Sequence, residues 1–224
     1  MRALRMNRRT YLVSFSGIDG AGKSTQIAAL RSRLEERGLK ILLVSFWDDI
    51  ARLTGLREAT GHRIFKGEKG VGTPSAPINR RDKNVTAWPM TAVRLFLYFI
   101  DAISVRLAVG KAANSGADLV ILDRYIFDEL ANLKLRNPAI RAYVRLIMKL
   151  VPKPDISYLL DADPVKARAR KPEYPLEFLH TNRQSYLAMS DLVGGMTVIA
   201  AMPVHEVKRI VLRHALEELS IRTP

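Results

Sequence analysis

Cysteine is absent from the 224-residue sequence. This absence excludes a disulfide scaffold, a zinc site made of thiolates and a cysteine nucleophile, and it fits the reducing cytoplasm. Long hydrophobic runs are missing as well. The apolar run 11–15 is too short for the core of a signal peptide, and the stretch 92–109 is interrupted by Arg94, Asp101 and Arg106. We therefore expect a cytoplasmic protein without a membrane span, in which 92–109 forms a buried or interface helix.

Acidic residues are few compared with basic ones. The chain has 22 acidic and 36 basic residues, a net charge of +14, and a sequence pI near 10.3. A positive field of this size attracts the phosphates of nucleotides, nucleic acids and anionic lipids, and it does not distinguish among them. The bases gather in a leader, 1–10, where Met6 is an alternative start to Met1, and in a glycine-rich segment, 52–84. We interpret this segment as either a substrate-covering loop or a solvated one.

Apolar runs alternate with helical patterns along the rest of the chain. Hydrophobic residues make up 48% of the sequence, enough for the core of one domain. We expect a helix over 24–37 that ends at Gly38, a closing amphipathic helix over 204–219, and strands over 11–16, 40–46, 118–123, 155–161 and 196–201. Strands separated by helices favour a parallel sheet covered on both faces. The sequence therefore predicts an α/β fold with a five-stranded parallel sheet.

A glycine-rich loop follows the first predicted strand and opens the first predicted helix. It matches the pattern G-x-x-x-x-G-K-[S/T] and consists of Gly17, Ile18, Asp19, Gly20, Ala21, Gly22, Lys23, Ser24 and Thr25. Glycines let backbone N–H groups converge on phosphate oxygens, and the helix N-terminus adds a favourable field for anions. Lys23 would then reach the β- and γ-phosphates, and Ser24 would bind Mg²⁺. The loop predicts a site for a nucleoside triphosphate.

Charged residues follow the other predicted strands, where ligands bind in open parallel sheets. Asp123 comes directly after an apolar run and is predicted to hold Mg²⁺, directly or through water; the alternative is a carboxylate that caps the next helix. Arg124 would bridge the donor and acceptor phosphates. Arg168 and Arg170, in a predicted lid over 164–182, would fold over the phosphates, unless they belong to a solvated face.

With these motifs in place, the sequence resembles the thymidylate kinase family of nucleoside monophosphate kinases over most of its length. The similar segments are the phosphate loop from Phe15 to Gln26, Asp123-Arg124-Tyr125, the positions Pro154, Asp155, Leu160, Asp161 and Pro164, and, after the lid, Phe178, Arg183, Tyr186 and Leu187. The resemblance implies a three-layer fold of the P-loop NTPase type, ATP and Mg²⁺ as cofactors, a homodimer, and catalytic arginines in the lid. It also implies that Asp19 approaches the 3′-hydroxyl of the acceptor and that Arg124 binds the acceptor phosphate.

The sequence departs from the family where the family reads the base and sugar of the acceptor. Ala102 follows Asp101, where the family has an arginine that contacts the thymine ring. Asn132 replaces the tyrosine that screens the ribose 2′ position. A site that lacks such hydrogen bonds is expected to discriminate less among acceptors.

Acidic residues also replace neutral or basic ones on the acceptor side. Asp128 stands where the family has a serine, and Glu129 where it has an asparagine or serine; Asp48 and Asp49 stand where an arginine for the acceptor phosphate is common. Each close pair of a carboxylate and a phosphate costs about 1–4 kcal/mol at surface-like dielectrics. Either the basic residues of 57–83 compensate, or the acceptor is not a monophosphate.

We predict a single P-loop kinase domain over 1–224 that transfers the γ-phosphoryl group of MgATP to a small acceptor, with dTMP as the leading candidate. Catalysis is assigned to Lys23, Arg124, Arg168 and Arg170, and Mg²⁺ to Ser24 and Asp123. The predicted acceptor site consists of Asp19, Phe46, Asp48, Asp49, Asp101, Arg124, Asp128 and Glu129.

Two alternatives stay open. One is a kinase that phosphorylates a nucleoside or another small hydroxyl compound, with Asp48 or Asp49 as its general base. The other is a protein that uses ATP as a switch for binding nucleic acid, which the net charge favours weakly. Because the sequence has no recognisable nucleic-acid module, no specific nucleic-acid partner is expected.

Overall fold

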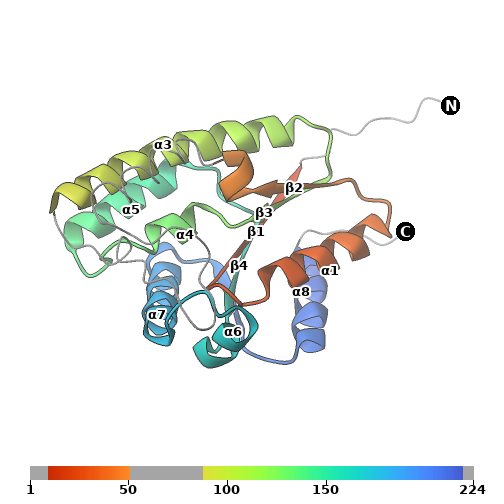
Figure 1. Ribbon diagram of the computed structural model, residues 1–224. Coiled ribbons are helices and arrows are strands. Elements are labelled where there is room, and N and C mark those ends of the chain that lie inside the picture. Colours follow the sequence, from red (N-terminus) through yellow and green to blue (C-terminus); the bar gives the residue numbers. More distant parts are fainter. Residues whose placement is uncertain (1–9, 51–87, 219–224) are drawn as a thin grey trace.

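A five-stranded parallel sheet forms the centre of the protein (Figure 1). The structure is a computed structural model and describes residues 10–50 and 88–218. Its strands are β1 (Tyr11–Ser16), β2 (Ile41–Ser45), β3 (Leu119–Asp123), β4 (Ile156–Asp161) and β5 (Met196–Ala200). They lie in the order β2-β3-β1-β4-β5, and every pairing is parallel. The predicted sheet is confirmed.

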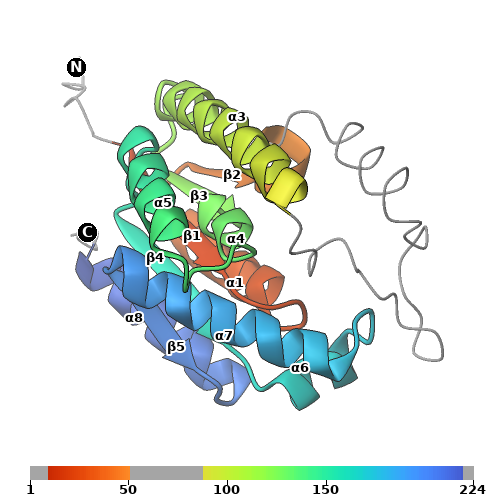
Figure 2. The same cartoon turned by 90° about the vertical axis from the view of Figure 1, so that its left-hand side faces the viewer.

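Helices cover both faces of the sheet and complete three layers (Figures 1 and 2). One face carries α1 (Lys23–Glu35) and α8 (Val204–Glu218), and the other carries α3 (Trp88–Ala113), α4 (Ile126–Leu130), α5 (Pro138–Leu150) and α7 (Leu176–Val193). The short helix α6 (Pro164–Arg170) joins β4 to α7. Each face has its own core, because successive residues of a strand point to opposite sides: Leu12 packs toward α3 and Val13 toward α1.

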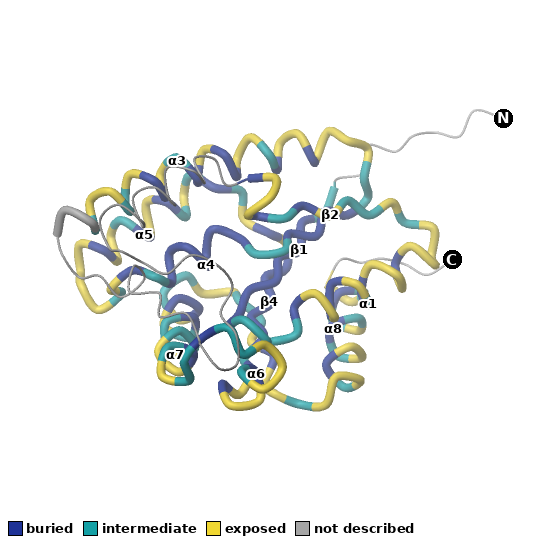
Figure 3. The backbone as a smooth tube through the Cα atoms, viewed as in Figure 1, coloured by how far each residue is buried: buried dark blue, intermediate teal, exposed yellow. Residues whose placement is uncertain are grey.

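The two edge strands are covered less completely than the central ones (Figure 3). In β1, every residue after Tyr11 is buried. Leu43 in β2 and Val198 in β5 are 39% and 44% exposed. From the apolar sequences we expect helices to cover both faces of every strand. The three central strands are covered in this way, whereas β2 and β5 are covered only in part.

Helix α1 begins at the glycine loop, and Gly38 terminates the turn that follows its last residue, Glu35. Its N-cap is Gly22, which is in the left-handed conformation and provides no side-chain cap for the first N–H groups of the helix. At the other end, the N–H of Leu39 donates to the carbonyl of Leu34 (3.2 Å) and the N–H of Gly38 to that of Glu35 (2.8 Å). This is the Schellman pattern with Gly38 at φ +79°. The predicted role of Gly38 as the helix terminator is confirmed.

The chain leaves the predicted strand after Ser45 and forms one turn of π-helix, η1 (Phe46–Ile50). Oδ2 of Asp49 accepts a hydrogen bond from the N–H of Ser45 at 2.7 Å and closes this turn. Phe46 is fully buried at its start, whereas Asp48 is exposed. The apolar pattern predicted that the strand continues to residue 46. Phe46 is indeed buried, but as the first residue of the π-helical turn.

The apolar stretch 92–109 lies inside α3, which packs on the sheet with one side and faces outward with the other (Figure 3). Among residues 10–50 and 88–218, no helix combines the length and apolar character needed to cross a membrane. The predictions for the leader up to residue 9, including the choice between Met1 and Met6, and for segment 52–84 lie outside the described residues.

Helix α6 touches the glycine loop at Gly20. A Cβ atom on Gly20 would lie 2.3 Å from the carbonyl oxygen of Ala167 in α6. The backbone has φ +79°, as it does at Gly38, where a Cβ would meet nothing within 4 Å. Position 20 therefore requires glycine for two reasons, its backbone conformation and the close approach of α6.

We expect Gly20→Ala to lower the free energy of unfolding more than Gly38→Ala. The two residues have the same φ, so the conformational cost of about 1–2 kcal/mol is common to both. The clash with Ala167 should add about 1–3 kcal/mol at Gly20 alone. Urea unfolding of the two variants measures this difference, and equal losses would contradict the close packing of α6 on the loop.

Candidate active site

The glycine loop lies at the carboxyl edge of the sheet, between β1 and α1 (Figure 1). Gly17 has φ +141°, and a Cβ there would lie 2.6 Å from the carbonyl oxygen of Leu160, so the backbone of β4 packs directly on the loop. Ser24 and Thr25 are exposed in the first turn of α1. The predicted residues thus form one continuous segment from loop to helix N-terminus, an arrangement suited to phosphate.

The side chain of Lys23 is turned back onto this loop. Its Nζ donates to the carbonyl oxygens of Gly17 (2.7 Å) and Ile18 (3.0 Å), and the residue is 7% exposed. Burial, together with the charge of Arg124, lowers the pKa of Lys23 to about 8. The ammonium group therefore titrates close to physiological pH.

Arg124 follows β3 in the left-handed region, with φ +68°, alone among the described non-glycine residues. Its N–H donates to the carbonyl of Phe15 at 3.1 Å. Nη2 lies 2.5 Å from Oδ1 of Asp19, and Nη1 lies 3.1 Å from Oδ1 of Asp128. The guanidinium connects the glycine loop with α4. A backbone of this kind costs about 1–3 kcal/mol and is typical of functional sites.

Asp128 is buried and accepts four hydrogen bonds. Oδ2 accepts from the hydroxyl of Ser16 (2.7 Å) and the N–H of Tyr125 (3.2 Å). Oδ1 accepts from the hydroxyl of Tyr186 (2.7 Å) and from Arg124 (3.1 Å). A carboxylate offers about four lone-pair positions, so the protein uses all of them. Asp128 is predicted from the sequence to contact the acceptor, whereas in the structure its bonds hold Arg124 and Tyr186.

Asp123 and Ser24 are the predicted magnesium ligands. Burial raises the pKa of Asp123 at the end of β3, and the charges of Lys23 and Arg124 act in the opposite direction. A carboxylate and a hydroxyl are hard oxygen ligands that suit Mg²⁺. No group of three or more potential metal-ligating side chains occurs in the part of the chain that the structure describes. A magnesium ion held here would therefore share its coordination with nucleotide phosphates, which fits the site.

The predicted lid arginines lie on α6, beside the glycine loop. The helix begins after Asp163, whose carboxylate accepts from the N–H of Lys166 at 2.9 Å. Nη1 of Arg170 lies 3.9 Å from the Cβ position of Gly22, and its Nε donates to the carbonyl of Lys166 at 3.1 Å. Nε of Arg168 is buried and has no hydrogen-bond partner among the described residues. Arg170 thus reaches over the start of α1.

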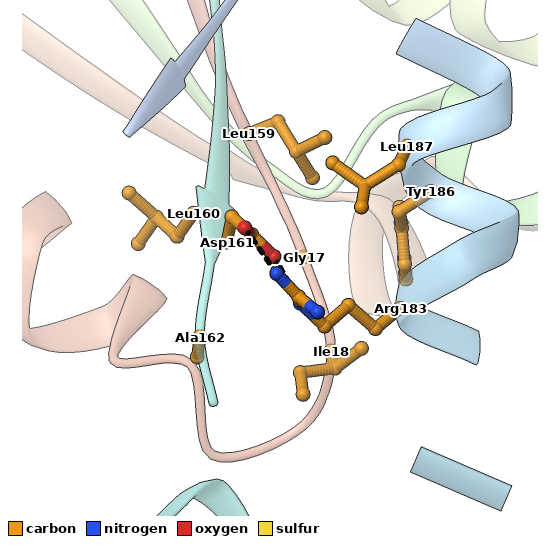
Figure 4. Close-up of a pocket in the computed structure, with 9 residues that line it drawn as sticks. All are labelled: Gly17, Ile18, Leu159, Leu160, Asp161, Ala162, Arg183, Tyr186 and Leu187. Carbon is orange, nitrogen blue, oxygen red and sulfur yellow. Dashed lines mark hydrogen bonds and ion pairs between the residues drawn. The ribbon is translucent and has the colours of Figure 1, made fainter. Parts of the chain in front are cut away.

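A small pocket lies between the glycine loop, β4 and α7 (Figure 4). It is lined by Gly17, Ile18, Leu159, Leu160, Asp161, Ala162, Arg183, Tyr186 and Leu187. Arg183 on α7 makes a forked ion pair with Asp161 at the end of β4, with distances of 2.6 and 2.8 Å. The pair fixes α7 to the sheet, and it places Tyr186, one helical turn further on, beside Arg124.

The remaining predicted acceptor residues are spread between the core and the surface. Phe46 and Asp101 are 0% exposed, and Glu129 is 6% exposed. Asp49 is bonded to the backbone of η1. Asp48 is exposed and lies near enough to Asp123 for its charge to raise the pKa of that carboxyl. Of these five, Asp48 combines exposure with proximity to the site.

The parallel sheet, the glycine loop with its lysine, and the arginines at β3 and on α6 define a P-loop kinase. The chain is 30% identical over 204 residues to the probable thymidylate kinase of Archaeoglobus fulgidus, covering 88% of this chain and 90% of that one. It is 28% identical over 222 residues to the probable thymidylate kinase of Pyrococcus abyssi, covering 93% and 98%. The chain belongs to the thymidylate kinase family.

The fold is similar to that of the thymidylate kinase from Candida albicans, with a TM-score of 0.63, 17% identity and 94% of each chain covered. No protein-family model matches the chain. The resemblance to the family is thus confirmed by relatives that match most of the chain, and the expected fold is confirmed by the structural similarity.

We expect the affinity for ATP to fall as the pH rises through about 8. Lys23 must be charged to bind phosphates, and its pKa is lowered to about 8, so binding above this pH takes up a proton. Calorimetry on both sides of this pH, in buffers of different ionisation enthalpy, measures affinity and proton uptake together. Lys23→Met should bind ATP weakly and without this pH dependence, yet melt close to the wild type. Normal ADP production by the folded variant would contradict the assignment.

Proposed function

We propose that the protein transfers the γ-phosphoryl group of ATP to dTMP with the help of Mg²⁺, and that it works in the cytoplasm as a homodimer. Membership of the thymidylate kinase family supports the reaction, and the lack of cysteine supports the compartment. The single observation that carries the proposal is the position of Arg124. Its guanidinium lies at the carboxyl edge of the sheet, 2.5 Å from the glycine-loop carboxylate Asp19, where a phosphate acceptor would meet the donor.

The proposed roles follow from charge and position. Lys23 and the α6 residues Arg168 and Arg170 would stabilise the charge on the phosphoryl group in transfer. Asp19 would accept a hydrogen bond from the 3′-hydroxyl of the acceptor. Mg²⁺, when held by Ser24 and Asp123, would supply further charge stabilisation at the nucleotide phosphates.

Two positions support a weaker preference for thymine and deoxyribose than the family shows. Ala102 is fully buried in α3 and carries no polar group. The side-chain amide of Asn132 donates to the carbonyl of Asp128 at 3.0 Å, which closes a turn of the chain. Each missing base or sugar contact is worth about 1–3 kcal/mol in a buried pocket. We therefore propose slower or less selective dTMP turnover than in a standard member of the family.

A nucleoside or another neutral hydroxyl compound is the second candidate acceptor, and Asp48 is the observation that favours it. The Asp48 carboxylate is exposed and makes no hydrogen bond with residues 10–50 or 88–218. Such a group could accept a proton from an acceptor hydroxyl. Asp49, its neighbour, is held by the backbone of Ser45, and so Asp48 is the better candidate base of the two.

We expect Asp48→Asn to separate the two acceptors. With dTMP, loss of this negative charge should leave turnover intact or lower the KM for the acceptor. With a neutral acceptor, the same change should lower kcat while leaving ATP affinity unchanged. An ADP-release assay across nucleosides and nucleotides gives both values. Asp49→Asn is the matched control, and it should affect stability rather than rate because its carboxylate closes η1.

A stripe of exposed apolar side chains on α3 supports the homodimer. Phe96, Phe99, Ile103 and Leu107 are 62%, 41%, 45% and 62% exposed and lie at helical spacing. Several large apolar groups together on one outward helix face are typical of a protein interface. A second copy of the chain is the occupant that the family resemblance implies, with the two stripes packed together around a twofold axis.

We expect Leu107→Asp to convert the protein to a monomer. An aspartate within an apolar interface would be buried without a partner. Val204→Asp is the control, because Val204 is 48% exposed on α8, on the other face of the sheet. Sedimentation or light scattering at micromolar concentration measures the mass. A wild-type monomer, or a dimer of Leu107→Asp, would show that α3 is not the interface.

A further inference from the structure

Arg124 is held by side chains from three separate elements. Asp19 belongs to the glycine loop, Asp128 to α4 and Tyr186 to α7. The hydroxyl of Tyr186 donates to Oδ1 of Asp128 at 2.7 Å and lies 3.5 Å from Nη1 of Arg124. Tyr186 is 5% exposed, and burial together with the charge of Asp128 raises its pKa well above the usual value. The hydroxyl therefore remains a hydrogen-bond donor throughout the physiological range.

These contacts leave part of the guanidinium without a hydrogen-bond partner among the described residues. Arginine presents five N–H donors in a planar fork. Nη1 faces Asp128 and Tyr186, and one hydrogen of Nη2 faces Asp19. Nε–H and the second hydrogen of Nη2 have no hydrogen-bond partner among residues 10–50 and 88–218. Two such donors can bind a phosphate in a two-point contact.

Asp128 fixes the orientation of the Arg124 guanidinium through its bond to Nη1. Its other oxygen is bound by the Ser16 hydroxyl at 2.7 Å and by the N–H of Tyr125 at 3.2 Å, so the carboxylate cannot turn without breaking these bonds. A carboxylate offers enough lone pairs to accept from all four of these donors at once, so Asp128 can bind Tyr186 and Arg124 without giving up Ser16 or Tyr125.

We infer that Tyr186 is a positioning residue for the acceptor phosphate: through Asp128, its hydroxyl holds Arg124 so that Nε–H and the second hydrogen of Nη2 can bind that phosphate, while Nη2 keeps its bond to Asp19. This inference rests on the proposed function, because it takes a monophosphate as the ligand of Arg124. The forked pair between Arg183 and Asp161 fixes α7 to the sheet. Acceptor affinity therefore depends on the position of α7, which carries Tyr186.

Tyr186→Phe tests the inference, because it removes the hydroxyl and keeps the ring. We expect the Kd and KM for dTMP to rise about tenfold, because an Arg124 guanidinium that is less well oriented should lose part of its two-point contact with the phosphate. The Kd for ATP should change little, and kcat should fall less than the KM rises, since Arg124 itself and its bond to Asp19 stay in place. Calorimetry and an ADP-release assay measure these quantities.

Tyr158→Phe is the matched control. Tyr158 is also buried, and its hydroxyl donates to the carbonyl of Val211 at 3.2 Å, on the α8 side of the sheet. The control removes a bonded hydroxyl from the core without touching Arg124. Its dTMP affinity should equal that of the wild type.

A double-mutant cycle shows whether the hydroxyl acts through Arg124. In an Arg124→Ala background, Tyr186→Phe should change the Kd for dTMP by less than about twofold. A tenfold loss in that background, or no loss in the single variant, would overturn the positioning role while wild-type turnover of dTMP still supports the proposed function. A wild type that neither binds nor phosphorylates dTMP would overturn the proposed function and this inference together.

Discussion

The absence of side chains at Gly17 and Gly20 lets three distant pieces of the chain meet at one edge of the sheet. At Gly17, the β4 carbonyl of Leu160 occupies the space that a Cβ would need, and at Gly20 the α6 carbonyl of Ala167 does the same. The loop is thereby held between the end of β4 and helix α6 by contacts of its own backbone. Lys23 and the arginines of β3 and α6 lie within reach of this loop because the backbone packing brings their elements there.

Carboxylates surround the cations of the site, although the protein as a whole is strongly basic. Ten of the fourteen net positive charges belong to residues 1–9, 51–87 and 219–224. Around Lys23 and Arg124 lie Asp19, Asp123 and Asp128. Cations removed from water need such partners, since an unpaired buried charge is costly. Most of the net charge therefore belongs to the two ends of the sequence and to segment 51–87, whereas Lys23 and Arg124 lie among carboxylates that balance their charge.

Local patterns predicted the parts of the site that are contiguous in the sequence. The glycine loop follows from a fixed spacing, and Asp123 and Arg124 from their place after an apolar run. The bonds of Asp128 to Tyr186 and Ser16 could not be predicted in this way, because these partners are 58 and 112 residues away in the sequence. A charged residue in a sequence does not reveal whether it faces a ligand or a buried tyrosine.

The unpredicted helices differ in how much signal the sequence held. Helix α5 has Asn137 as its N-cap, with a side chain that accepts from the N–H of Ala139 at 2.9 Å, followed by Pro138 in the first turn. An N-cap asparagine followed by proline is a regular start signal for a helix, so the sequence does contain the information for α5. The π-turn η1 had no such signal, since its residues continue the apolar pattern of β2.

The central position of β1 has a consequence for how the protein is synthesised. β1 is the first strand to be made, yet its partners are β3 and β4, and the N–H of Leu12 is bonded to the carboxylate of Asp155, 143 residues later. Ribosomes add about 5–20 residues per second, so this strand waits roughly seven to thirty seconds until Asp155 has been made. During that interval its apolar side chains must be shielded from water in another way, by the ribosome or by a chaperone. The nucleotide site can form only after Leu160, on which Gly17 packs, has left the ribosome.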